Sequence, residues 1–364
     1  MYKKIFMGIA AVAALTLVSC SSDDLNSLSD NSSKNEAISF DGYWGRSAVA
    51  VNGSRGSVID KAEDLQKVSE GFGVFGNYNS TDGQVFGPNL FNNEKVYYSS
   101  TKPAKWTYDN TKYWPTEGHI DFLAYAPYVQ GMKLTNNTTT NTTSCIKFDV
   151  AKEVANQKDL SWAKADGQTK EENSGANKVK FQFAHALSRL GYTVKLSEKC
   201  SSVATITLKN VTLAGSDPTT GSTTESTGAF YTNGTIDLAT GKWSSTSGNQ
   251  DFNWFSAETA GTQPVTFTST SAETYKSTDY LFVIPQNFEV GNENENKLYV
   301  IVEYTISYSD VTNPFTYKVY KKLEKNFLQG KAYMINLTIG LTPIEFDADV
   351  TAWKDTDQKD VHWN

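Results

Sequence analysis

The sequence predicts an all-β protein made of two tandem antiparallel β-sandwich domains. Aromatic residues make up 13% of the chain, with 19 Tyr and 19 Phe, and such side chains favour strands. Short runs of alternating apolar and polar residues recur along the chain, separated by Gly, Asn, Ser and Asp. No amphipathic helical stretch of convincing length lies between them, which argues for packed antiparallel sheets rather than a parallel α/β sheet.

The first residues read as an export signal. Lys3 and Lys4 precede a run from residue 5 to 18 that is apolar apart from one Gly and one Thr. This run is shorter than the ~20 residues of a transmembrane helix, but it suits the core of a signal peptide. It leads into Leu-Val-Ser-Cys, which is typical of lipoprotein precursors. We therefore predict a lipoprotein signal peptide at residues 1–19 and acylation of Cys20. The alternative is an ordinary signal peptide with an incidental cysteine.

Residues 20–37 are expected to form a lipidated flexible tether, because Ser, Asp and Asn dominate this segment. Asp23 and Asp24 lie just after the lipidated position, where acidic residues direct some lipoproteins to the cell surface. The expected location is therefore the outer membrane, lipid-anchored and facing the exterior of the cell. The alternative is that both residues only reflect the composition of a tether.

The N-terminal β-sandwich is predicted at residues 38–177. Its first strand carries Ile38 and Phe40 on one face. In the segment 119–128 both alternating faces are apolar, which indicates a strand in the middle of a sheet. The polar, glycine-containing stretch at 167–177 sets the boundary with the next domain.

The C-terminal β-sandwich is predicted at residues 178–343. Phe181 and the apolar residues that follow it alternate in one phase, whereas Tyr192 and its neighbours alternate in the opposite phase. We expect a β-bulge between residues 188 and 191 to change the register. The cleanest alternation in the chain lies at 298–308, where every second residue is apolar or Tyr.

The polar residues do not form a recognisable catalytic site. The three histidines are scattered at positions 119, 185 and 362, and no nucleophile elbow, H-E-x-x-H or glycine-rich phosphate loop is present. His185 shares a strand face with Phe181 and Phe183, which favours a core histidine over a metal ligand. We therefore expect no enzymatic activity, no cofactor and no metal. The net charge of −7 argues against a nucleic-acid partner.

Two cysteines besides Cys20 leave alternatives open. Cys145 and Cys200 match no metal-binding spacing. Outside the cytoplasm they are able to form one disulfide, and the alternative is two separate buried thiols.

An ordered set of segments resembles the fimbrillin family, the lipoprotein-derived subunits of type V pili of the FimA and Mfa-like kind. These segments are GFGVFGNY, KWTYDNTKYWPTEGHIDFLAYAPY, KDLSWA, FQFAHALSRLGYTVKL, YLFVIPQ and IEFDADVTAW, and they span nearly the whole mature chain. The resemblance implies two tandem transthyretin-like β-sandwiches, in agreement with the fold class that the strand pattern predicts.

The resemblance also implies a mode of assembly. In polymerising members an arginine-specific protease removes the N-terminal strand, and the exposed groove accepts a donor strand from a neighbouring subunit. Here the released strand would be residues 38–44, and Arg46 and Arg55 are the candidate processing sites. The chain lacks a single unmistakable processing arginine. The alternative is therefore a subunit that stays uncut and lipid-bound as an anchor.

Residues 344–364 are the candidate donor segment. Ile344, Phe346 and Val350 alternate with polar residues, so that the segment has one apolar and one charged face. The alternative is a final edge strand that packs in the second sandwich of its own chain.

The implied partners are other fimbrillin subunits in a homo- or heteropolymer, the outer membrane through the lipid anchor, and a host or bacterial surface ligand. A second functional class is a surface glycan-binding lipoprotein of a nutrient-uptake system. In that case Trp114, Trp243 and Trp254 would line an exposed platform instead of packing in cores and turns. An N-terminal strand at residues 38–44 that is paired within the first sandwich and followed by a cleavable loop would instead favour the pilus subunit.

Overall fold

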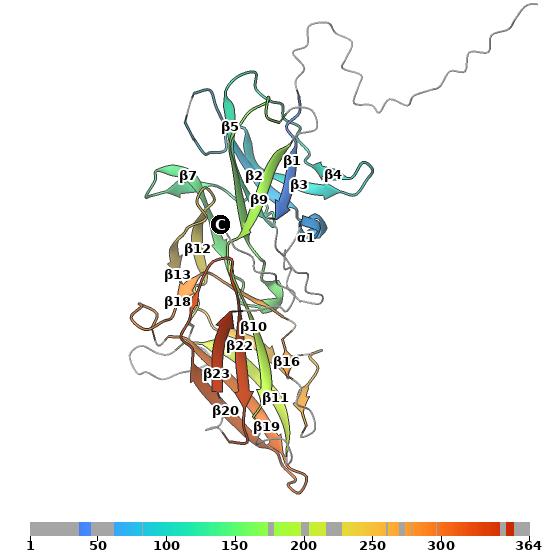
Figure 1. Cartoon of the computed structure of the whole chain (residues 1–364), viewed down its shortest axis with the longest axis vertical. Coiled ribbons are helices and arrows are strands. Elements are labelled where there is room, and N and C mark those ends of the chain that lie inside the picture. The colour runs from blue at the N-terminus through green and yellow to red at the C-terminus, as the bar shows by residue number, and fades with distance from the viewer. Residues whose placement is uncertain are drawn as a thin grey trace, which may run out of the picture.

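The described part of the chain is built almost entirely from strands. The computed structural model describes residues 36–44, 62–81, 83–173, 178–197, 204–215, 228–259, 261–268, 274–277, 279–295, 297–342 and 347–352. Figure 1 shows an elongated molecule with two strand-rich regions along its long axis. The predicted all-β fold is confirmed. Helix α1 (Ala62–Lys67) and the 3-10 turn η1 (Val154–Asn156) are short additions that the sequence pattern does not predict.

A seven-stranded sheet forms the upper region in Figure 1. Neighbouring strands in this sheet are antiparallel, except that its first two strands run parallel. The sheet curls, so that β1 at one edge approaches β4 at the other, and α1 lies against β1. The order across the sheet is β1 (Phe40–Trp44), β9 (Val179–His185), β8 (Ser161–Gln168), β5 (His119–Ala126), β2 (Phe72–Asn79), β3 (Phe91–Ser99) and β4 (Lys105–Thr107).

The curled sheet encloses an aromatic core. Five different strands each contribute a phenylalanine that is at most 1% exposed, namely Phe40, Phe72, Phe91, Phe122 and Phe181. Burying one such side chain contributes about 1.5–3 kcal/mol. Edge-to-face ring pairs add about 0.5–1.5 kcal/mol beyond that burial. Much of the stability of this sheet therefore lies inside its curl.

β5 is the central strand that the apolar residues on both of its faces predict. It lies between β8 and β2. On one face Ile120, Phe122 and Ala124 belong to the aromatic core. On the other face Leu123 and Tyr125 belong to a second core that continues through the rest of the molecule. The prediction of a central strand is confirmed.

The expected bulge between residues 188 and 191 is wrong. β9 ends at His185 in the seven-stranded sheet, and β10 (Ser188–Leu196) begins in a different sheet. The chain crosses between the two sheets at Ala186 and Leu187, which are at most 2% exposed. A crossing and a bulge both invert the phase of the alternation, so the sequence pattern is the same for either.

Two five-stranded sheets form the lower region in Figure 1. One has the order β16 (Tyr275–Lys276), β10, β22 (Ala332–Ile339) and β23 (Asp347–Ala352), with β17 (Leu281–Val283) also paired to β10. The other has the order β14 (Phe252–Ser256), β11 (Thr205–Ala214), β19 (Tyr299–Ser307) and β20 (Phe315–Lys322), with β15 (Val265–Phe267) paired to β11. The alternation predicted at 298–308 is confirmed, because Val300, Val302, Tyr304 and Ile306 are fully buried.

The sheets do not divide at residue 178, where we placed the domain boundary. A four-stranded sheet of β13 (Trp243–Ser247), β12 (Asn233–Asp237), β7 (Thr142–Asp149) and β6 (Thr135–Asn137) pairs strands from both sides of that position, and β18 (Gln286–Asn287) pairs with β21 (Asn326–Phe327). β9 also follows the boundary yet belongs to the first sheet. The polar stretch 167–177 lies between two strands of one sheet, whereas the crossing itself is apolar. The division into two tandem transthyretin-like domains stays a prediction.

Because the molecule has two separate cores, we predict that truncating a side chain in one core destabilises mainly the strands around that core. Phe122→Ala removes a fully buried ring from the aromatic core, a change that typically costs about 3–5 kcal/mol. Hydrogen exchange should then speed up in β2 and β5, while β19 keeps its protection. The control Val302→Ala, in the other core, should give the opposite pattern. Equal loss of protection in both regions for Phe122→Ala would show that the molecule opens as one unit.

Candidate assembly surfaces

β1, the candidate released strand, is paired within the first sheet. Its five residues run parallel to Val179–Phe183 of β9. β8 reaches β9 only at its far end, through the pairs Ser161 with His185 and Trp162 with Ala184. β1 therefore supplies the ladder partners for most of β9. Without β1, the first five residues of β9 would present unpaired backbone groups, which is costly when they are buried.

An isolated bridge fixes the chain just before β1. Ala37 pairs with Tyr113, and the N–H groups of Ile38 and Trp114 donate the two hydrogen bonds of this bridge, at 2.8 and 3.0 Å. The hydroxyl of Tyr108 also donates to the carbonyl of Ile38 at 2.7 Å. These contacts fix the position of β1 in its groove. The groove is the space beside β9 that β1 occupies, and the side chains of the aromatic core line it.

Phe40 is the main side chain that β1 places in the groove. It is 1% exposed, and its ring centroid lies 5.4 to 5.7 Å from those of Phe91, Tyr108, Phe122 and Phe181. Two of these contacts are edge-to-face and one is stacked. Removing β1 would expose these four rings to water at once.

Gly42 lies where the groove has no room for a large side chain. A Cβ built on this residue would lie 3.0 Å from Cδ2 of Leu65 and 3.4 Å from ring carbons of Phe72 and Phe183. A methyl group would fit if the end of the Leu65 side chain shifted slightly, but a longer side chain would meet all three neighbours. The groove therefore selects a large residue at position 40 and a small one at position 42.

The candidate processing and lipidation residues lie outside the described residues. Arg46 and Arg55 fall between the end of β1 at Trp44 and the start of α1 at Ala62. Cys20 precedes the first described residue, Glu36. Within the part of the chain that the structure describes, no helix is long and apolar enough to cross a membrane.

The candidate donor segment is partly described and lies at a sheet edge. Ile344 and Phe346 fall outside the described residues, whereas Val350 lies in β23 and is partly buried. β23 pairs antiparallel with β22 and forms the last strand of its sheet. Ala348 is the buried residue of this strand, at 7% exposure. Donor capacity stays a prediction, and β23 occupies an edge from which it can leave without breaking the middle of a sheet.

Polar contacts add little to the hold on β23. Lys321 of β20 approaches Asp347 with 2.9 Å between Nζ and Oδ1, and this ion pair spans the edges of the two five-stranded sheets. The hydrogen bond from Lys321 lowers the pKa of the Asp347 carboxyl below its usual value. Both side chains are well exposed, so the pair contributes little in water. Asn336 also donates to Thr351 at 3.0 Å.

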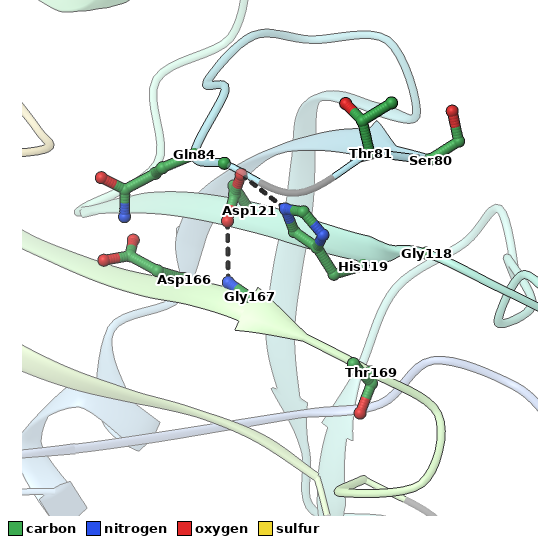
Figure 2. A pocket seen from close by; sticks show the side chains of 10 residues that line it. Ser80, Thr81, Gln84, Gly118, His119, Asp121, Asp166, Gly167 and Thr169 are labelled. Atoms are coloured by element: carbon green, nitrogen blue, oxygen red, sulfur yellow. Dashed lines mark hydrogen bonds and ion pairs between the residues drawn. The ribbon is translucent and has the colours of Figure 1, made fainter.

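An open pocket of about 570 Å³ lies at the start of β5. Figure 2 shows His119 and Asp121 in it, beside Asp166 and Gly167 at the end of β8. Asp121 is 1% exposed and accepts hydrogen bonds from the N–H groups of Val85 at 2.8 Å and Gly167 at 2.7 Å. His119 Nε2 lies 3.3 Å from its Oδ2.

The side chains that line the pocket hold neighbouring segments together through their hydrogen bonds and ion pairs. The contacts of Asp121 engage both of its oxygens, leaving it poorly placed to take a proton from a substrate. Asp166 lies 2.6 Å from the ammonium of Lys164 through Oδ2, and its Oδ1 is buried without a hydrogen-bond partner. Among the described residues, no group of three or more His, Cys, Asp or Glu is placed to hold a metal ion.

His185 is partly buried, with 15% of its side chain exposed, and Cys145 is buried. His185 Nδ1 lies 3.0 Å from Oδ2 of Asp159, which is 2% exposed, so the histidine has a partner within the fold. His362 lies outside the described residues. Cys145 is a buried free thiol, and burial raises its pKa to about 11, with a further contribution from the nearby Asp237. Cys200 lies outside the described residues, so a disulfide with it stays untested.

The three tryptophans of the alternative glycan platform do not form one. Trp114 and Trp254 are buried, at 4% and 6% exposure. Trp243 is partly buried, and its indole N–H donates to the carbonyl of Ala186 at 2.7 Å. All three rings pack within the fold, which agrees with packing in cores and turns and not with an exposed glycan-binding platform.

Gly42 and Tyr108 help to seat β1 in the sheet, and the sequence pattern did not reveal either role. In the sequence Gly42 is an ordinary interruption of the apolar face of a strand, and Tyr108 is one aromatic residue among many. Their roles depend on neighbours distant in the sequence, such as Leu65 for Gly42 and Ile38 for Tyr108. The alternation of Ile38 and Phe40 with a glycine two residues later was the only available signal.

One solved structure shows the same fold. A fimbrial protein from Bacteroides vulgatus has a TM-score of 0.64 and 22% identity, with 88% of this chain and 100% of that chain covered. Proposed cell adhesion proteins from Bacteroides uniformis and Bacteroides ovatus both have 15% identity, with TM-scores of 0.46 and 0.45. They cover 89% and 90% of this chain, and 99% and 100% of their own chains. A search of curated proteins finds no match.

A protein-family comparison is more direct than these structural likenesses. The model of a family described as fimbrillin-like matches residues 61–353. The match extends over most of the chain, from the start of α1 to the end of β23. The chain therefore belongs to the fimbrillin-like family.

Proposed function

We propose that the protein is a cell-surface fimbrillin, a structural and adhesive subunit of a type V pilus that assembles by strand exchange. The observation that carries this proposal is the pairing of β1. This short N-terminal strand fills an aromatic groove and supplies the ladder partners of β9. Family membership supports a structural role, and the packing of the three tryptophans within the fold removes the main support for glycan binding.

Removal of β1 would leave a groove in which the binding of another strand is strongly favourable. The exposed groove would present four aromatic rings around the place of Phe40 and the unpaired edge of β9. An incoming strand with matching side chains would restore both the ladder and the apolar packing, as in strand addition generally. The sheet is otherwise complete, so that a single strand is enough to close it.

The donor in this proposal is the C-terminal segment, with Ile344, Phe346 and Val350 as the docking side chains. Support comes from the edge position of β23 and from its exposed polar contacts. A strand at an edge has one ladder to break, whereas an internal strand has two. The segment can therefore leave its own sheet at a moderate cost and gain a deeper groove in return.

The proposal also includes the route to the surface. The precursor is exported, acylated at Cys20 and anchored in the outer membrane by its lipid, and proteolysis after Arg46 or Arg55 then frees it for polymerisation. Its partners are other fimbrillin subunits and a ligand on a host or bacterial surface. The export signal at residues 1–20 and the two arginines after β1 support this route.

Lipidation predicts a specific effect of Cys20→Ala. The variant precursor should lose labelling by a palmitate analogue and associate only weakly with membranes, because no other cysteine lies at the end of the signal peptide. Cys145→Ala is the control and should keep normal labelling, since this thiol is buried in the fold. Normal labelling of Cys20→Ala would rule the lipid anchor out.

Processing predicts that an arginine-specific protease cuts the folded protein first after Arg46 or Arg55. The new N-terminus, read by sequencing, should be Ser47 or Gly56, and the double variant Arg46→Gln/Arg55→Gln should resist cleavage. Arg189→Gln is the control, because Arg189 lies in β10 with its N–H bonded to Lys331 and its guanidinium over Tyr280. A first cut elsewhere while both early arginines stay intact would contradict the proposal.

Strand donation predicts that deletion of residues 344–364 leaves a folded monomer that cannot enter fibres. The described residues of the deleted segment, 347–352, form an edge strand, so circular dichroism and gel filtration should remain close to those of the intact protein. Electron microscopy of cells that produce the variant should show no fibres, whereas deletion of residues 353–364 alone should leave more assembly intact. Unfolding of the lower region would instead make the segment an essential core strand.

A further inference from the structure

Two segments far apart in the chain carry the same side-chain pattern. Residues 38–42 read Ile-Ser-Phe-Asp-Gly, and residues 344–348 read Ile-Glu-Phe-Asp-Ala. The first segment enters the groove as β1 and the residues just before it, and the second leads into β23. Each shared position meets a separate requirement of the groove.

The first requirement is a pair of large apolar side chains two residues apart. Ile38 and Phe40 are each 1% exposed and both belong to the aromatic core. In the second segment Ile344 and Phe346 have the same identities and the same spacing. They would restore the same contacts without any change in the rings that line the groove.

The second requirement is a small residue at position 42. The space beside Gly42 admits a Cβ only at 3.0 Å from Cδ2 of Leu65, the movable end of a side chain. The residue that corresponds to Gly42 is Ala348, which has one methyl group and nothing beyond it. It is therefore the largest side chain that the position accepts with a small adjustment.

The third requirement concerns position 37, where the corresponding residue is Pro343. Proline lacks a backbone N–H and is tolerated in a sheet only where none is needed. The hydrogen bonds of the bridge at Ala37 are donated by Ile38 and Trp114. Position 37 therefore contributes no N–H to the bridge, and a proline there leaves both bonds in place.

The outward face matches as well. Asp41 is paired in register with Lys180 of β9, and both Lys180 and Gln182 are exposed. The residue that corresponds to Asp41 is Asp347, so the same negative charge would face the same lysine. The apolar and the polar faces therefore select one alignment together.

Other alignments fail at the same positions. A shift of two residues in one direction places Phe346 at the position of Gly42, where only a Cβ fits. A shift of two in the other direction places Ala348 in the space of Phe40 and Val350 at the position of Gly42. A shift of one residue turns the apolar face away from the groove.

The segment of the same chain cannot reach this groove. β22 runs parallel to β10 and ends beside Leu196, at the end of the lower region that is farther from the crossing at Ala186. Its eight residues span ~27 Å. The five residue steps from Ile339 to Ile344 span at most ~18 Å, which is less than the length of β22 back toward the crossing. Figure 1 shows β1 in the other region of the molecule.

We propose that residues 343–348 of a second copy of this chain occupy the β1 groove in the register of β1. Ile344, Phe346 and Ala348 take the places of Ile38, Phe40 and Gly42, and the strand runs parallel to β9. This inference rests on the proposed strand exchange and adds the identity of the partner and the alignment. The contact joins two different surfaces of identical subunits, so that each subunit keeps one free surface for the next, as a growing fibre requires.

Paired cysteines on the exposed face of the full chain test the alignment. The matched pairs are Lys180→Cys with Asp347→Cys and Gln182→Cys with Asp349→Cys, and the mismatched pair is Lys180→Cys with Asp349→Cys. Matched positions would be neighbours ~4.8 Å apart across two strands, within the range of a disulfide, whereas the mismatch adds ~7 Å along the strand. After processing, assembly and mild oxidation, non-reducing gels should show covalent multimers from matched chains, about tenfold more than from mismatched chains.

The outcomes separate the alignment from the strand exchange itself. Fibres that form while the mismatched pair cross-links as well as the matched ones, or while neither cross-links, would overturn the alignment only. Absence of fibres from the processed protein without added cysteines would overturn the proposed function and this inference with it. Single-cysteine variants control for the native thiols.

A second measurement does not depend on assembly. The full chain with Ala37→Pro, Ser39→Glu and Gly42→Ala carries the donor sequence in place of its own at residues 37–42. Its thermal unfolding midpoint should stay close to that of the unchanged protein, whereas Gly42→Val should lower the midpoint clearly. A large drop in the midpoint of the triple variant would show that the groove does not accept the donor sequence in this register.

Discussion

The upper region depends on the pairing between β1 and β9. β9 reaches its other neighbour through two residue pairs only, so β1 supplies the ladder along most of its length. The same short strand inserts Phe40 among four aromatic rings and closes the curl of the sheet against β4. Hydrogen bonding and apolar burial are therefore concentrated in one short edge strand. Losing such a strand is costly unless another strand takes its place, and the proposed exchange between subunits would meet that condition.

The direction of the strands gives the molecule a polarity. The groove of β1 lies in the upper region, and the chain that leads to the C-terminal segment leaves the far end of the lower region after β22. There the chain turns, and β23 runs back antiparallel along β22. The sheet edges β20 and β23 are joined by an exposed ion pair between Lys321 and Asp347, which contributes little stability in water.

Two buried polar side chains, Asp121 and Gln157, hold separate segments of the described chain together. Asp121 binds the N–H groups of Val85 and Gly167 and thereby joins two segments to β5. Gln157 likewise accepts from the N–H of Phe282 at 2.7 Å and donates to the carbonyl of Ala151 at 3.0 Å. Groups that are engaged in this way gain stability from satisfied hydrogen bonds.

Local patterns determined the class of the fold, and contacts between distant residues determined how its parts meet. Alternation within the sequence was sufficient for the strand at 298–308 and for the two buried faces of β5, because the burial of a strand follows the period of its side chains. The same alternation could not show that the chain changes sheet at Ala186 and Leu187, because a bulge and a crossing invert the phase alike. It could not show the limit on size at Gly42 either, since that limit is set by Leu65, Phe72 and Phe183. The sequence by itself therefore determined an all-β chain with a repeated Ile-x-Phe-Asp pattern at its two ends. Only the tertiary structure decided that the first copy of this pattern completes a sheet, because the groove is formed by strands that the chain brings together from separate positions.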